Sequence, residues 1–194
     1  MRKVLPVIQF SHMLVAAKLE AGGNAIDATA GNGNDTLFLI NHIGKNSKLF
    51  VFDIQEDAIQ QTKNKLSESL SQADYNKLNQ RLNFFCTSHE HIDQYVNEPV
   101  KVIMFNLGYL PGSLSGIITK PYTTLKAIKK GLQILLPQGL MSIVLYPGHE
   151  GGEEEAELVS SYLSSLNSYE YGVLQYKHIN KKKSPFLIAV EKKR

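Results

Sequence analysis

The 194-residue chain has no tryptophan, a single cysteine and no long uncharged hydrophobic run. Cys86 alone excludes an intrachain disulfide framework and a zinc cluster built on cysteines, which favours a cytoplasmic protein without a metal site. Near the N-terminus the apolar stretch is interrupted by Gln9, Ser11, His12 and Lys18. A signal peptide and a membrane span are therefore not expected.

Length and composition are typical of one compact domain. With 43% hydrophobic and 20% charged residues, the chain has enough apolar side chains for a full core. We expect a single domain over 1–194, with an N-terminal helix in 1–22 and the core in 23–194. A net charge of +3 permits a polyanionic partner but does not require one.

Hydrophobic periodicity predicts alternating strands and helices, hence a mostly parallel sheet with helices on both faces. The polar segment 74–79 is predicted to be a connection. The last two strands are separated only by "INKKK", so they should pair as a hairpin, which makes one strand antiparallel. The predicted strands are 24–29, 48–54, 82–88, 100–107, 139–148, 169–178 and 184–192, and the predicted helices are 7–20, 34–44, 55–70, 121–135 and 153–166.

The segment "AIDATAGNGNDT", 25–36, reads as a short strand, a glycine turn and a helix that is capped near Asn34. Gly31 and Gly33 let the backbone approach a ligand closely, beside the free N–H groups of the helix start. Asp53 ends the second strand, where a carboxylate accepts hydrogen bonds from ribose hydroxyls. The alternative is a tight turn that only begins a helix.

Two common nucleotide motifs are absent from this turn. Thr36 stands where a dinucleotide fingerprint needs its third glycine, and no P-loop pattern is present. The pattern thus favours a nucleoside cofactor without a diphosphate, and Asp27 before the turn suits a cationic or amino-bearing group.

These residues carry a family resemblance. "DATAGNGNDT" with Asp53 resembles the first two motifs of the class I S-adenosylmethionine-dependent methyltransferases. Together with "FNLGYLPG" and "YPGHEGGEEE" it resembles, more narrowly, the putative rRNA methylase group, which includes enzymes that methylate the wobble uridine of tRNA. The resemblance implies a Rossmann-like α/β fold with a seven-stranded, mostly parallel sheet, one antiparallel strand and an extra N-terminal helix.

The resemblance also implies the cofactor, S-adenosyl-L-methionine, and the residues around it. Residues of the glycine turn and its two flanks would line the methionine part of the cofactor, and Asp53 with Ile54 would hold its ribose and adenine. Ser88 and His89 follow the third strand, from which this family contacts adenine, although His89 is equally readable as a helix-start residue. The residues of the glycine turn and its flanks are Asp27, Ala28, Gly31, Asn32, Gly33, Asn34, Asp35 and Thr36.

Asn106 and Tyr109 are the expected catalytic residues at the end of the fourth strand, and Asn106 is also expected to contact the cofactor. They stand where N-methylating relatives carry the first and last residues of an N/D-P-P-Y/F motif, although Leu107 and Gly108 replace the prolines. A carbonyl at a strand end can accept N–H bonds from an amine and aim its lone pair at an activated methyl group. The alternative is a turn in which the asparagine caps local backbone and the tyrosine packs.

Two histidines are further candidates for this site. His149 follows the fifth strand at the same edge and is a candidate for taking the proton of an incoming amine. A loop histidine that is only structural is the alternative. His12 in the first helix is a candidate for the rim of the same site.

Lysines gather in two places, around 177–183 and along the predicted helix 121–135. Such clusters suit phosphates, but a charged hairpin is also a common guard of a sheet edge. No separate RNA-binding pattern is present, so the domain itself would recognise an unpaired base, and a homodimer would enlarge its surface. The clustered residues are Lys120, Lys126, Lys129, Lys130, Lys177, His178, Lys181, Lys182 and Lys183.

The resemblance implies an N-methyltransferase that acts on the anticodon region of tRNA, at the aminomethyl group of a modified wobble uridine. The alternatives are the same fold acting on rRNA or on a small amine, and a nucleic-acid-binding protein without catalysis.

Overall fold

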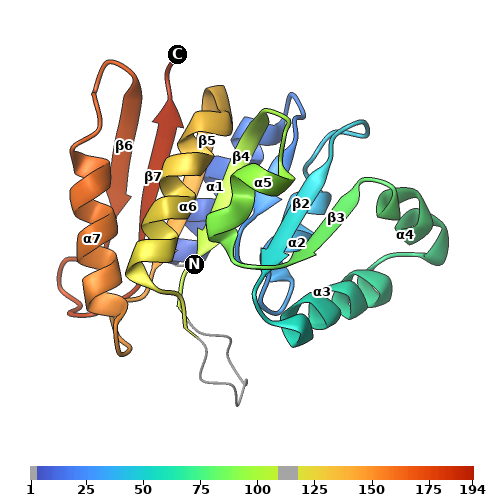
Figure 1. The fold of residues 1–194 in the computed structure, drawn as a ribbon, viewed down its shortest axis with the longest axis horizontal. Helices are drawn as coiled ribbons and strands as arrows, with labels where there is room; N and C mark the ends of the chain where they lie inside the picture. The colour runs from blue at the N-terminus through green and yellow to red at the C-terminus, as the bar shows by residue number, and fades with distance from the viewer. Residues whose placement is uncertain (1–3, 109–117) are drawn as a thin grey trace.

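The computed structural model describes residues 4–108 and 118–194. It contains a seven-stranded sheet with the order β3-β2-β1-β4-β5-β7-β6 (Figure 1). Only β7 runs antiparallel to its neighbours, β5 and β6, which confirms the predicted α/β fold. The strands are β1 Ala25–Asp27, β2 Leu49–Asp53, β3 Leu82–Cys86, β4 Val100–Asn106, β5 Leu135–Leu145, β6 Tyr171–Tyr176 and β7 Phe186–Lys192.

Helices cover both faces of the sheet, and the central strands are therefore buried on both sides. One hydrophobic cluster lies beneath α1, α2 and α3, and the other beneath α5, α6 and α7. The helices are α1 Val7–Leu19, α2 Asn34–Ile40, α3 Glu56–Ser69, α4 Gln72–Asn79, the 3₁₀ turn η1 His89–His91, α5 Ile92–Tyr95, α6 Pro121–Ile134 and α7 Gly152–Ser164.

The N-terminal helix α1 lies across β4, β5 and β7. The hydroxyls of Ser11 and Ser142 are 2.6 Å apart, and the ring of Phe10 stacks on Tyr176 with centroids 4.3 Å apart. Lys18 forms an ion pair with Glu191. These contacts fix α1 over the face that carries the end of β4.

Two local predictions were wrong. Segment 74–79 belongs to the helix α4, which Ser71 caps by accepting from the backbone N–H of Asp74 at 3.2 Å. The sequence signal was weak because no residue of α4 is buried, so apolar periodicity is missing. The helix α2 begins at Asn34 with Gly33 as its N-cap, as expected, but it ends at Ile40, before the predicted stop at Gly44.

Candidate functional site

A cleft of about 870 Å³ opens at the carboxyl edge of the sheet, around the ends of β1, β2 and β4. This is where ligands bind in open parallel α/β sheets. Most of the predicted cofactor residues line it: Ala28, Gly31, Asn32, Asn34, Asp35, Asp53, Ile54, Ser88, His89 and Asn106. Asp27, Gly33 and Thr36 are buried and are not among the lining residues. Tyr109 lies outside the described residues.

The glycine turn requires a glycine at position 33. Gly33 has φ +74°, and a Cβ there would lie 2.9 Å from the Cα of Thr62 in α3. A side chain would therefore both strain the backbone and push α3 away. The side chain of Asn34 accepts a hydrogen bond from Lys65 and does not cap α2.

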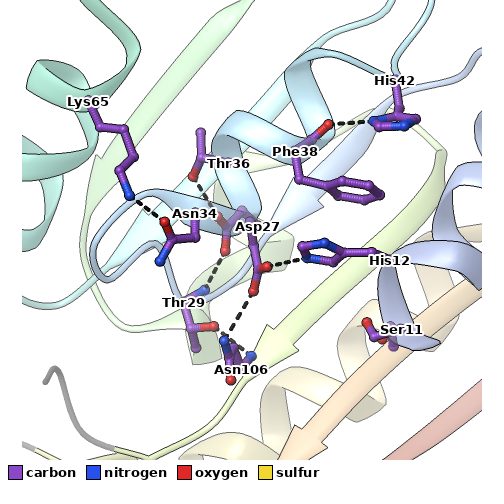
Figure 2. A network of polar contacts seen from close by, with 12 residues as sticks. Ser11, His12, Asp27, Thr29, Asn34, Thr36, Phe38, His42, Lys65 and Asn106 are labelled. Carbon is purple, nitrogen blue, oxygen red and sulfur yellow. Dashed lines mark hydrogen bonds and ion pairs between the residues drawn. The ribbon is translucent and has the colours of Figure 1, made fainter. Parts of the chain in front are cut away.

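Asp27 stabilises the glycine turn through hydrogen bonds to residues on either side of it. Its carboxylate accepts hydrogen bonds from the backbone N–H of Thr29 at 3.1 Å and from the hydroxyl of Thr36 at 2.5 Å (Figure 2). Complete burial, followed by the nearby Asp35, raises its pKa to about 7. A buried carboxylate whose oxygens are both used by the turn itself serves to hold the turn.

Asp53 lies at the end of β2 and is partly exposed to the cleft. Its two oxygens accept from the backbone N–H groups of Gly31 at 2.9 Å and Gln55 at 3.0 Å. Each carboxylate oxygen has a second lone pair, so Asp53 can still accept from the hydroxyls of a ribose.

His89 is one of the residues that line the cleft, and its ring is buried. Its Nδ1 lies 3.3 Å from the carbonyl oxygen of Ala28, so the hydrogen sits on Nδ1. Nε2 is buried and has no hydrogen-bond partner among residues 4–108 and 118–194. Burial lowers the pKa of His89 to about 4, which keeps the ring neutral at pH 7 and Nε2 an acceptor.

The end of β4 is joined to α1 and α2 through Asp35. Nδ2 of Asn106 donates to Oδ2 of Asp35 at 3.2 Å, and Nε2 of His12 donates to Oδ1 at 2.6 Å. The His12 ring also stacks on Phe38 of α2, with centroids 3.9 Å apart. Figure 2 shows His12 pointing from α1 into this network, with Asn106 at the end of its strand.

This arrangement determines which way the Asn106 amide faces. The oxygens of a carboxylate only accept, so the NH₂ group of Asn106 must face Asp35. The carbonyl Oδ1 is then left for the cleft, which Asn106 lines. The backbone N–H of Asn106 donates to the hydroxyl of Thr29 at 2.7 Å and fixes the strand end.

Leu107 and Gly108 occupy backbone positions that proline cannot take. The N–H of Leu107 donates to the carbonyl of Val144 at 2.9 Å, and the N–H of Gly108 to the hydroxyl of Thr119 at 3.0 Å. Gly108 also has φ +142°. Proline has no N–H and fixes φ near −65°, so the two prolines of the N/D-P-P-Y/F motif are excluded here.

Glu155, a residue that the sequence analysis did not identify, lies next to this strand exit. It is 1% exposed and accepts from the hydroxyls of Thr119 at 2.7 Å and Thr124 at 2.6 Å. Burial raises the pKa of Glu155, although the hydrogen bonds from the two hydroxyls lower it. Glu155 thereby holds Thr119 in place for Gly108. The only sequence signal was its helical position among three glutamates.

His149 lies at the predicted edge but is not among the residues that line the cleft. Its Nδ1 is 2.8 Å from the carbonyl oxygen of Glu150. A Cβ added to Gly152 would lie 2.9 Å from its ring, and one added to Gly108 would lie 3.5 Å from Nε2. The ring therefore packs between the two loops that follow β4 and β5.

Several residues of the cleft were not singled out from the sequence. They come from α1, the turn after β1, the residue before α3, η1 and the segment around the start of α6, and only Thr29 and Ala30 belong to the glycine-turn motif. They are Ile8, Thr29, Ala30, Gln55, Glu90, Ile118, Thr119 and Thr123. Lys120, which belongs to a predicted lysine cluster, and Tyr146, which belongs to the motif "YPGHEGGEEE", also line it.

Within the described part of the chain, no cluster of three metal-ligating side chains is present. Over the same residues, no helix has the length and hydropathy needed to cross a membrane. Cys86 is exposed and its thiol is free.

Comparisons with known proteins agree with this geometry. Residues 49–191 match the family described as putative rRNA methylase. A chloroplastic tRNA (mnm(5)s(2)U34)-methyltransferase of Arabidopsis thaliana is 36% identical over 192 residues, 95% of this chain and 69% of the relative.

Two solved structures are similar over nearly their whole length. A putative rRNA-methylase from Clostridium thermocellum is 36% identical, with a TM-score of 0.89 over 98% of this chain and 100% of that one. A putative methyltransferase from Streptococcus mutans, in complex with SAH, is 35% identical, with a TM-score of 0.84 over 97% of this chain and 99% of that one.

Proposed function

The chain belongs to the putative rRNA methylase family and is an S-adenosylmethionine-dependent methyltransferase, and from this premise we propose that it methylates a nitrogen of tRNA. The substrate we propose is the aminomethyl group of a modified uridine at the wobble position, as the name of the Arabidopsis relative indicates for that protein. We propose that it acts in the cytoplasm.

The residues of the cleft fit the cofactor. The glycine turn permits close approach of a ligand, Asp53 keeps free lone pairs for hydroxyl groups, and Nε2 of His89 is a buried acceptor suited to an amino group of adenine. Asp27, Gly33 and Thr36, which were predicted to line the cofactor, are better explained as the support of the turn.

The observation that carries the proposal is the orientation of Asn106. When bound, S-adenosylmethionine supplies an electrophilic methyl group, which an amine lone pair takes in one in-line displacement. The Oδ1 of Asn106 faces the cleft because Asp35 binds its NH₂ group. An acceptor there can hold one N–H of an amine and fix the direction of the lone pair.

The chemistry of the cleft favours nitrogen over a pyrimidine carbon as the methylated atom. Methylation of a pyrimidine carbon generally needs a thiolate nucleophile in the site. Cys86, the single cysteine, is not among the lining residues, and burial together with Glu56 raises the pKa of its thiol.

Tyr109 is proposed as a second positioning group for the amine, on the sequence alone. His149, whose ring packs against Gly108, is proposed as the proton acceptor. A pH profile of the rate with His149→Gln tests it: loss of the acidic limb supports a proton-transfer role, and an unchanged profile contradicts it.

Mass spectrometry of nucleosides from tRNA and rRNA, with and without the gene, tests the substrate. Loss of the methylated aminomethyl uridine from tRNA is the expected result. Loss of a methylated rRNA nucleoside instead would support the alternative that the family name suggests. In vitro, labelled methyl transfer to tRNA from the deleted strain should be restored by the wild-type chain and not by Asn106→Ala.

A further inference from the structure

The β6–β7 hairpin lies at the same edge of the sheet as the cleft. Phe186 pairs with Leu145 and Leu187 with Tyr176, so the connection between the two strands extends past the carboxyl end of β5. Asn106 pairs with Val144 one strand away. Figure 1 shows the hairpin at the lower edge, where β4 also ends.

The hairpin is fixed against the loop that follows β5. A Cβ added to Gly148 would lie 3.3 Å from the carbonyl oxygen of Lys183. The ammonium of Lys183 lies 3.2 Å from a carboxylate oxygen of Glu153, in the first turn of α7. Lys183 has φ +55°, a backbone conformation that costs a lysine about 1 kcal/mol or more. Three consecutive lysines are thus held together in a turn that local preferences disfavour.

The lysines of the hairpin do not guard the edge strand. An edge strand is usually protected by charged residues within it. The sequence of β6, "YGVLQY", has no charged residue, and Val173 and Leu174 are 42% and 49% exposed. The charge lies instead beyond the strand, at 177–183, on the side of the cleft.

Two lysines of the hairpin have no ion pair within the described residues, in contrast to several lysines elsewhere in the fold. In the described part of the chain, Lys18, Lys48, Lys126 and Lys130 each form an ion pair with an acid. Lys181 and Lys182 are exposed and form no ion pair with residues 4–108 or 118–194. Lys120, at the rim of the cleft, is likewise exposed and without such a pair there.

We propose that the basic hairpin, residues 177–183, together with Lys120 is a docking surface for the phosphates of RNA next to the methylated nucleotide. The inference rests on the proposed function, since it takes RNA as the substrate. Lys181 and Lys182 bind phosphates of the strand that enters the cleft. Glu153 competes with phosphate for Lys183.

The test measures binding of an anticodon stem-loop RNA by fluorescence anisotropy over a range of KCl concentrations. The slope of log K against log salt is negative, and each lost phosphate contact reduces its magnitude by about 0.7 for single strands. Lys181→Gln with Lys182→Gln should therefore make the slope less negative by about 1.4 and lower the affinity at 0.1 M salt on the order of tenfold. SAH affinity should be unchanged.

The matched control removes the same charge at the opposite edge. Lys45 and Lys77 are exposed, form no ion pair among the described residues and precede β2 and β3. Lys45→Gln with Lys77→Gln should change the RNA affinity less than twofold. Glu153→Gln should act in the opposite direction and tighten binding.

Equal affinities and slopes for the hairpin and control variants would overturn the docking surface. If the wild-type chain methylates tRNA and the hairpin variant keeps its KM, the docking surface is wrong while the proposed function stands. If the hairpin variant loses RNA binding but the wild-type chain transfers no methyl group to any RNA, the docking surface stands while the proposed function fails.

Discussion

Asp35 in the first turn of α2 accepts a hydrogen bond from the side-chain amide of Asn106 at the end of β4, across 3.2 Å. The bond joins residues 71 positions apart in the chain. It places the NH₂ group of Asn106 toward the protein and its carbonyl toward the cleft. His12 holds the other oxygen of Asp35 and brings α1 into the same arrangement.

Removing Asp35 should lower the rate more than the affinity for the cofactor. In Asp35→Ala the Asn106 amide is free to rotate, and a misplaced positioning group costs about 100-fold in rate. We expect kcat for tRNA methylation to fall by this order, as in Asn106→Ala. Single-turnover kinetics with calorimetry of SAH binding measure the two effects.

His12→Gln should have a smaller effect, because its amide can still donate to Asp35. The exposed Asn41→Ala at the end of α2 serves as the control and should keep the wild-type rate. A full rate in Asp35→Ala would show that the orientation of Asn106 does not depend on this bond.

Asp53→Ala should weaken cofactor binding. Hydrogen bonds to a charged group contribute about 1.5–3 kcal/mol each, so the Kd for S-adenosylmethionine should rise at least tenfold. Calorimetric titration measures it, with Asp57→Ala, exposed at the start of α3, as the control. Because Asp53 also holds Gly31, thermal unfolding must show that the variant is folded. Unchanged affinity would remove Asp53 from the cofactor site.

Asp27 should make the protein less stable as the pH rises. The native state keeps the proton of Asp27 up to a pKa of about 7, whereas the unfolded chain releases it near 3.8. The raised pKa favours folding at low pH, and this contribution is lost between about pH 4 and pH 7. Asp27→Asn removes that titration.

Urea unfolding of the wild type and of Asp27→Asn from pH 4 to pH 8 measures the difference. The free energy of unfolding of the wild type, relative to the variant, should decrease over this window and be level above it. Two parallel curves would mean that Asp27 does not titrate in the native state.

Glu155→Ala should destabilise the fold and loosen the exit of β4. It leaves the hydroxyls of Thr119 and Thr124 without their buried acceptor, which costs about 1–3 kcal/mol for each group left unpaired. Thermal unfolding should show a lower Tm and kinetics a higher KM for tRNA. Glu154→Ala, one residue earlier and exposed, should be close to wild type. Equal Tm values for the two variants would contradict this role.

Local patterns were sufficient for most of the fold. Alternating strands and helices, the glycine turn and the strand-ending Asp53 depend on neighbours in the chain, so the sequence determined the sheet, its one antiparallel strand and a nucleoside site, while the motif resemblance identified the cofactor. The short exposed helix α4 was missed because it buries no residue and so has no apolar period.

The tertiary structure alone decided the roles of individual side chains. Asp27 and Asp35 both belong to the same motif, yet burial under the turn makes one a support, and contact with β4 makes the other a partner of Asn106. Likewise, only packing buries Glu155 while its neighbour Glu154 stays exposed. Such contacts join segments that are distant in the chain, and spacing along the sequence carries no information about which of them meet.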